Sequence, residues 1–296
     1  MGRDLSELSL EELLNVDEKD DIYTHYLELC ELANGFRASA QANHKEELDA
    51  YNRVVTKVAN YLKRSGLIPN ALTYCGALSQ LVHKANIFGR ISRDDETYDE
   101  EISGKCGSMI LNSKSNCRVM ANFFGDVLNK AGIETRIMPT RIISGSQDNS
   151  MIFENVLNVP MPFSSMVFDN DADTLDCNHM CITFEFDNHA FMYDPYNMLL
   201  LSLHGIEAKS LNGDYLFYLC PTGYIYHYGK SYRWMLGEIK RLTEFDELTE
   251  TQEDFYLKFI NDAAYAFNER DHSALREAIE PQVREFKSLK YSRKYY

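Results

Sequence analysis

The hydrophobic period changes twice along this chain of 296 residues, and the order of the changes limits the folds open to it. Residues 1–90 show apolar side chains at three- and four-residue steps, which indicates helices. Residues 91–235 hold one helical segment and then short alternating segments separated by polar turns, which is typical of strands. Residues 236–296 return to the helical period. Helices, then one helix with a sheet, then helices again predict an α+β fold rather than an alternating α/β fold.

The helical segments are bounded by residues that cap or break helices. The clearest segment runs over residues 45–64, and Gly66 follows it as a C-terminal cap. Shorter helical patterns cover residues 71–82 and 255–267. Pro281 is expected to cap or break the last helix, because proline lacks the N–H that a helix interior needs.

The alternating segments predict strands, such as those over residues 135–143, 178–186, 189–194 and 215–219. Two of them are separated only by the polar pair Asp187-Asn188. Because a two-residue polar connection is typical of a tight hairpin turn, these two strands are expected to pair in antiparallel fashion.

Charge limits the partners that this chain can have. The chain has 45 acidic and 30 basic side chains, so its formal net charge is −15. Sequence-independent nucleic-acid binding and docking on anionic lipid both need a basic surface, so we expect neither. An apolar stretch of about 18–20 residues, which a bilayer-spanning helix needs, is absent from the sequence. An acidic surface instead favours cationic substrates such as polyamines or lysine-rich peptides.

Cysteine usage points to a reducing compartment. The seven cysteines are an odd number spread over a long chain, which suits free thiols better than a disulfide framework. Residues 1–30 are acidic and lack the pattern of a secretory signal. We therefore expect a soluble cytoplasmic protein, and the sequence leaves its oligomeric state open.

One cysteine falls where a helix would activate it. Residues 117–131 carry a single apolar stripe, Gly132 fits the left-handed position that ends a helix, and Ser113 or Ser115 could cap its start. Cys117 then lies in the first turn, where unpaired backbone N–H groups and the helix dipole favour a thiolate and can donate to an oxyanion.

A thiolate catalyst also needs a base and a group that orients the base. His179 begins the first strand of the predicted hairpin and Asp194 ends the second. At the open end of such a hairpin the two residues would be diagonal neighbours on one face, within reach of the orienting hydrogen bond. The sequence therefore predicts a Cys117, His179 and Asp194 triad.

These residues carry a resemblance to the transglutaminase-like superfamily. Cys117 is followed fifteen residues later by Gly132-Ile133-Glu134-Thr135-Arg136-Ile137, which resembles the glycine–isoleucine–arginine step after that family's nucleophile helix. His179 and the Tyr193-Asp194-Pro195 sequence resemble the family's histidine and aspartate motifs. Cys181 and Thr183 depart from the pattern, because the family usually has an aromatic and an acidic residue there. The resemblance covers residues 105–200. The chain is also similar, more distantly, to arylamine N-acetyltransferases.

The resemblance implies a papain-like core, which we assign to residues 91–235. The hydrophobic period, and not the resemblance, predicts the helical N-terminal region (1–90) and the helical C-terminal region (236–296). The resemblance implies that Cys117 forms an acyl-enzyme from an amide or thioester and passes the acyl group to an amine or to water. His179 would move the proton and Asp194 would hold the imidazole. The second oxyanion donor is open between Asn112 and Asn116, and no cofactor or metal is required. A small-molecule amine or a peptide or protein is the expected substrate.

Other interpretations of these residues stay open. A cysteine peptidase or amidase would use the same triad for hydrolysis only, and an inactive relative would be a binding module. Cys106 is an alternative nucleophile because glycines lie close on both sides, although poor helix follows it. His189 is an alternative base, but opposite parity on one strand directs it away from Asp194.

Two spacings in the sequence resemble those of metal sites. Cys177, His179 and Cys181 form a C-x-H-x-C pattern without a second cysteine pair elsewhere. The alternating acidic residues of 169–173 resemble a calcium loop, but Thr174 stands where such a loop has its glycine. An acidic surface loop is the simpler interpretation of the second pattern.

Overall fold

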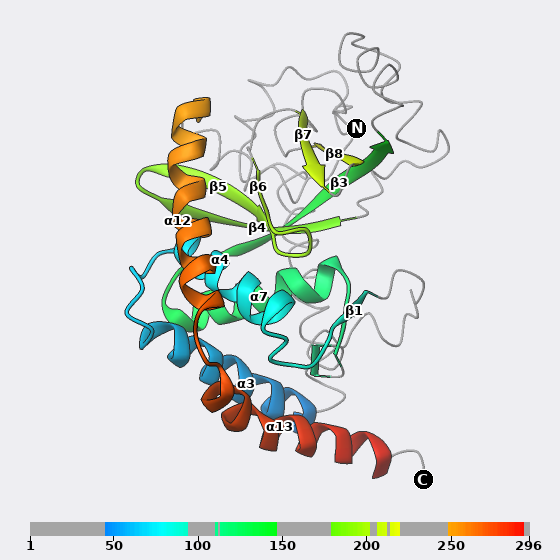
Figure 1. The fold of residues 1–296 in the computed structure, drawn as a ribbon. Helices are drawn as coiled ribbons and strands as arrows, with labels where there is room; N and C mark the ends of the chain where they lie inside the picture. The colour runs from blue at the N-terminus through cyan, green and yellow to red at the C-terminus, as the bar shows by residue number, and fades with distance from the viewer. Residues whose placement is uncertain are drawn as a thin grey trace, which may run out of the picture. The chain divides into compact units, whose positions relative to one another are not determined.

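The computed structural model describes residues 45–93, 110–111, 113–146, 179–201, 206–211, 214–219 and 248–292. Within these ranges the chain is a mixture of helices and a largely antiparallel sheet, so the predicted α+β class is confirmed (Figure 1). The described helices are α3 (Lys45–Lys63), α4 (Ala71–Ser79), the π-helix η2 (Gln80–Lys84), α7 (Cys117–Ala131), α12 (Glu250–Asn268) and α13 (Ser273–Ser292).

The strands form one small ladder and one larger sheet. A parallel pair joins β1 (Ser92–Arg93) to β2 (Lys114–Ser115). The larger sheet has the strand order β6-β5-β4-β3-β8-β7. Its strands are β3 (Arg136–Ser146), β4 (His179–Phe186), β5 (His189–Asp194), β6 (Leu199–Leu201), β7 (Ile206–Leu211) and β8 (Asp214–Leu219). β6 and β7 are not among the strands that the sequence predicts, and β6 has only three residues.

The β4–β5 hairpin has the turn that the sequence predicts. Asp187 and Asn188 both have a positive φ, of 53° and 58°, which is the backbone of a type I′ turn. Asp and Asn tolerate this conformation better than most residues, and the turn matches the right-handed twist of the strands. The strands pair in antiparallel fashion, with Phe186 opposite His189 and Ile182 opposite Tyr193.

The chain divides into two compact units. The first comprises Met1–Ala33, Met138–Met180 and Leu201–Glu247, and the second comprises Asn34–Ile137, Cys181–Leu200 and Leu248–Tyr296. The described part of the first unit is strand, including all of β7 and β8. The second unit contains the described helices from both ends of the chain together with the β4–β5 hairpin from Cys181 onward. β3 and β4 are continuous strands that belong partly to each unit.

Helix α4 lies at the centre of the second unit. All nine of its residues are buried, and Asn70 caps its start by accepting a hydrogen bond from the Thr73 N–H at 2.8 Å. Helix α12 packs along α4 (Figure 1). The two backbones are so close that a Cβ at Gly76 would lie 2.1 Å from the carbonyl oxygen of Ile260. Only glycine allows this approach.

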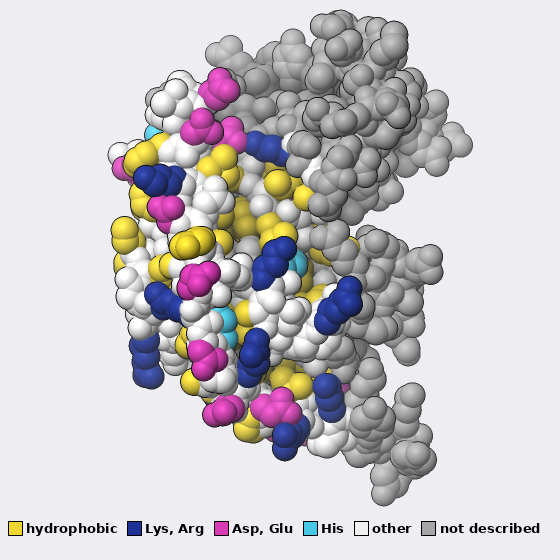
Figure 2. Space-filling model, viewed as in Figure 1, with side chains coloured by type: hydrophobic (Ala, Val, Ile, Leu, Met, Phe, Trp, Pro, Cys, Tyr) yellow, Lys and Arg dark blue, Asp and Glu magenta, His cyan; other side chains and the backbone are white. Residues whose placement is uncertain are grey.

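The face of the described part that Figure 2 draws is mixed in charge. On the face drawn in Figure 2, basic and acidic side chains alternate, with hydrophobic side chains between them. Among the described residues the exposed large hydrophobic side chains are Ile68, Phe255 and Tyr265. A search of the described helices found none with the length and hydropathy that crossing a bilayer requires.

Helix α13 does not end at Pro281, so that prediction is wrong: Pro281 lies inside the helix. Interior proline costs roughly 3 kcal/mol because it removes a hydrogen bond and crowds the preceding turn. Helix α13 packs along α3, and it buries Leu275, Ile279, Val283 and Phe286 on both sides of the proline. Each such side chain contributes about 1.5–3 kcal/mol on burial, so tertiary packing outweighs the local cost.

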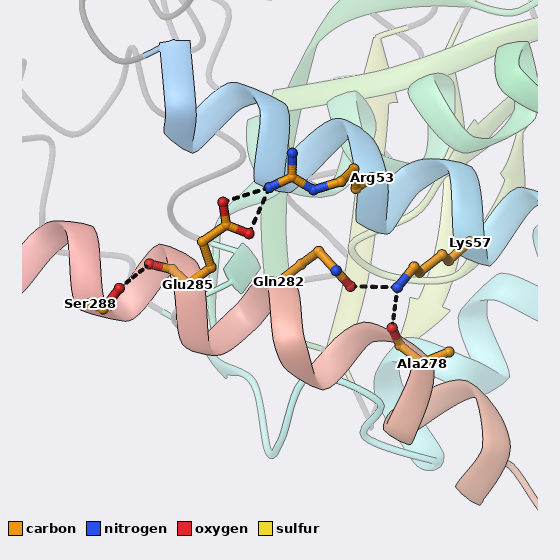
Figure 3. Close-up of polar contacts among 6 residues, drawn as sticks. All are labelled: Arg53, Lys57, Ala278, Gln282, Glu285 and Ser288. Atoms are coloured by element: carbon orange, nitrogen blue, oxygen red, sulfur yellow. Dashed lines mark hydrogen bonds and ion pairs between the residues drawn. The ribbon is translucent and has the colours of Figure 1, made fainter.

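Polar contacts fix how α13 lies on α3 (Figure 3). Arg53 Nη2 donates to both carboxylate oxygens of Glu285, at 2.7 and 2.6 Å. Lys57 Nζ donates to the Ala278 carbonyl and to Gln282 Oε1. Both charged side chains of the ion pair are almost half exposed, so the pair contributes little to stability and mainly sets the register of the two helices.

Gly76→Ala is expected to destabilise the protein by about 1–3 kcal/mol in urea unfolding, because the new methyl group forces α4 and α12 apart. This loss exceeds the gain of about 1 kcal/mol that alanine brings to a helix interior. Gly125→Ala is the matched control, since its Cβ would meet Thr135 Oγ1 at an ordinary 3.5 Å. Equal stabilities for the two variants would contradict the close approach.

Candidate active site

Cys117 is the first residue of α7, as the sequence predicts. The cap is Asn116 rather than Ser113 or Ser115: its Oδ1 accepts a hydrogen bond from the Val119 N–H at 2.9 Å. The prediction of a serine cap is wrong. Asn116 lies directly before the helix with an extended backbone, and its side chain reaches the backbone N–H of the third helix residue, Val119. At the other end Gly132 has a φ of 94°, which confirms the left-handed cap.

The surroundings of Cys117 suit a nucleophile. The apolar stripe of α7 is buried, whereas Cys117 itself is partly exposed. The other cysteines in the described part of the chain, Cys75 and Cys181, are fully buried. Burial raises the pKa of the Cys75 thiol well above its usual value. Among the described cysteines, therefore, Cys117 combines access with the positive end of a helix dipole.

His179 and Asp194 lie close together, as predicted. Ile182 pairs with Tyr193, so continuing this register places Cys181 opposite Asp194 and His179 one diagonal step away on the same face. One ligand atom from each of His179, Cys181 and Asp194 lies within 4.8 Å of the other two. The three side chains are at most 6% exposed. The His179 ring also makes an edge contact with Tyr218, at 6.1 Å between ring centroids.

The Asp194 carboxylate is oriented by the turn that follows it. Oδ1 accepts hydrogen bonds from the backbone N–H groups of Tyr196 and Asn197, at 2.9 and 3.1 Å. Oδ2 accepts one from Asn197 Nδ2 at 2.8 Å. Asp194 is 0% exposed, so these donors replace water around a buried carboxylate and hold it in one orientation.

Helix α4 and η2 support the strand residues on either side of Asp194. The hydroxyl groups of Ser79 and Tyr193 are 2.7 Å apart. His83 Nε2 donates to the Pro195 carbonyl at 2.9 Å, which places the ring proton on Nε2. The Tyr193 ring also stacks on Phe124 of α7, the helix that begins with Cys117. Sequence reasoning missed these contacts, since each joins residues that are far apart in the sequence and meet only in the fold.

The remaining candidates divide into those that lie elsewhere and those outside the described residues. His189 is at the turn end of the β4–β5 hairpin, opposite Phe186, and is therefore away from Asp194. The Oδ1 atom of Asn116 caps the helix. The role of its Nδ2 group as an oxyanion donor stays a prediction. Asn112, Cys106, Cys177 and residues 169–173 lie outside the described part of the chain.

Comparison with known proteins adds no neighbour. Searches of family models, curated proteins and solved structures each returned nothing that matches this chain. The site is therefore interpreted from its own residues.

The buried bond between Ser79 and Tyr193 is expected to show strong coupling. Burial raises the pKa of the Tyr193 hydroxyl, so the group is neutral and needs a hydrogen-bonding partner. Tyr193→Phe or Ser79→Ala alone should each cost about 1–3 kcal/mol, because each leaves an unsatisfied buried hydroxyl. The double variant should cost less than the sum of the singles, measured by urea unfolding in a double-mutant cycle. Additive losses would show that the two groups do not interact.

Proposed function

We propose that this protein is a transglutaminase-like thiol enzyme with a papain-like core, which forms an acyl-enzyme on Cys117. The main support is the proximity of His179 and Asp194 across the β4–β5 hairpin, together with the position of Cys117 at the start of α7. A buried histidine beside an ordered carboxylate is the arrangement that fixes an imidazole tautomer in thiol enzymes. The resemblance of the motifs to the transglutaminase-like superfamily agrees with this assignment.

The proposed reaction begins when the Cys117 thiolate attacks the carbonyl carbon of an amide or thioester. The carbonyl oxygen becomes an oxyanion, and the N–H groups at the start of α7 stabilise it. His179 holds the thiol proton as an imidazolium and gives it to the departing amine or thiol as the carbon–nitrogen or carbon–sulfur bond breaks. Asp194 keeps the imidazole in place and stabilises its positive charge.

The acyl-enzyme is then resolved by an amine or by water. His179 removes a proton from the incoming nucleophile, which attacks the thioester carbon and releases the Cys117 thiolate. Transfer to an amine requires that water be excluded while the amine binds. Hydrolysis alone would make the protein a cysteine peptidase or amidase with the same residues. The formal net charge of −15 favours an amine acceptor that is cationic before it binds.

Selective alkylation tests the nucleophile without a known substrate. With limiting iodoacetamide at neutral pH, peptide mapping of the native protein should show that Cys117 reacts first. Cys75 should stay unmodified, because it is fully buried and burial raises the pKa of its thiol. His179→Gln should slow the alkylation of Cys117 by about tenfold or more, since the imidazole stabilises the thiolate. Equal labelling of Cys117 and Cys75 would contradict the proposal and favour a binding module.

Turnover tests the triad as a unit. A glutamine-containing peptide or a thioester is incubated with a fluorescent primary amine, and amine incorporation is measured beside acid release. Cys117→Ala and His179→Ala should each abolish both products while the circular dichroism spectrum is kept. The double variant should be hardly worse than either single variant, because the residues act together. Product formation by Cys117→Ala would exclude the acyl-enzyme, and acid release without amine incorporation would assign hydrolysis.

A further inference from the structure

Cys181 has no part in the proposed reaction, yet it lies in the same buried cluster as His179 and Asp194. In the sequence, Cys181 and Cys177 flank His179 at two-residue steps. In the fold the partner of Cys181 is instead Asp194, which the β4–β5 register places directly opposite. The cluster therefore offers one nitrogen, one sulfur and one oxygen, each within 4.8 Å of the others.

This donor set matches the preferences of zinc. Zn²⁺ accepts imidazole nitrogen, thiolate sulfur and carboxylate oxygen, and tetrahedral geometry separates its ligand atoms by about 3.5 Å. The three ligand atoms of the cluster lie within 4.8 Å of one another, so shifts of about 1 Å would bring them to that separation. Calcium and magnesium prefer sites built from oxygen atoms, so a buried sulfur and nitrogen disfavour them.

The surroundings of the cluster also suit a metal. Ligating carboxylates are usually held by hydrogen bonds from a second set of residues, and Asp194 accepts such bonds from Tyr196 and from Asn197. The three donors come from two paired strands, which are more rigid supports than loops. Three protein ligands leave a fourth position for water, as in zinc sites that exchange ligands.

We propose that His179, Cys181 and Asp194 bind Zn²⁺ or a similar borderline-soft divalent ion, and that this ion switches the thiol chemistry off. Binding forms metal bonds to the imidazole nitrogen, the thiolate and the carboxylate. It displaces the Cys181 thiol proton to solvent and the imidazolium proton of His179 to solvent or back to Cys117, without a redox step. A coordinated His179 can no longer carry the proton of Cys117. The inhibitory half of the inference rests on the proposed function, whereas the metal site itself does not.

Cobalt tests the metal site independently of activity. The full-length protein is stripped with a chelator and titrated with Co²⁺, a spectroscopic substitute for zinc. One equivalent should produce the sulfur-to-cobalt charge-transfer band and the visible bands of a tetrahedral site, and Zn²⁺ should remove them. Cys181→Ser and Cys181→Ala should both lose the charge-transfer band and bind cobalt at least about tenfold more weakly. Cys75→Ala is the matched control of a buried thiol outside the cluster and should keep the band.

A cobalt complex without a charge-transfer band would overturn the metal site, and so would a band that survives both Cys181 substitutions. Loss of the band in Cys117→Ser would also overturn it, because the nucleophile would then be the ligand. The regulatory half is measured as the ratio of Cys117 alkylation rates without and with Zn²⁺. This ratio should be at least about tenfold in the wild-type protein and near one in Cys181→Ser.

The two arms separate the failures of the two proposals. If Cys117 shows no selective alkylation while the cobalt band depends on Cys181, the proposed enzyme fails and the metal site stands. If Cys117 is selectively alkylated but zinc does not slow the reaction in the wild-type protein, the enzyme stands and the switch is wrong.

Discussion

The close crossing of α4 and α12 at Gly76 is the constraint on which the second unit depends. A helix whose nine residues are all buried has to be covered on every side, and α12 can cover it only where the backbones approach at Gly76. Helix α12 thereby packs on α4, and α13 continues the contact along α3. The interior is close-packed, so a single added methyl group at this crossing would displace a whole helix.

The same buried helix supports the candidate site. Beyond Ser79 the helix continues as the π-helix η2, a form that often occurs near functional sites. Ser79 and His83 then contact Tyr193 and Pro195, the two neighbours of Asp194 in the sequence. A carboxylate that is buried, ordered and supported in this way interacts strongly with any nearby cation, because little water screens it. The imidazolium of His179 and the proposed zinc ion are two such cations. Because Zn²⁺ binds the neutral imidazole, a proton and the zinc ion would compete for His179.

The sequence predicts local features of the structure well where a few neighbouring residues decide the backbone conformation. Helix α7 runs from Cys117 to Ala131 as expected, since its apolar stripe and Gly132 are both local signals. The hairpin turn at Asp187-Asn188 follows from residues that tolerate a positive φ. The diagonal relation of His179 and Asp194 then follows from turn length and strand parity alone. The predictions failed at Pro281 and at the serine cap, where tertiary packing and the nearest available side chain, respectively, outweighed the expected signal.

By itself, the sequence determined the α+β class, the helix that begins with Cys117, and the hairpin that brings His179 to Asp194. These depend on interactions over a few residues, so hydrophobic period, caps and turn residues are sufficient to read them. Only the tertiary structure decided that α4 is the buried centre, that Ser79 and His83 support the residues around Asp194, and that Cys181 joins the cluster. Such contacts join residues that are far apart in the sequence, or residues such as Cys181 whose sequence neighbours suggest a different partner. Their geometry is set by how helices and strands pack together, which a local pattern does not encode.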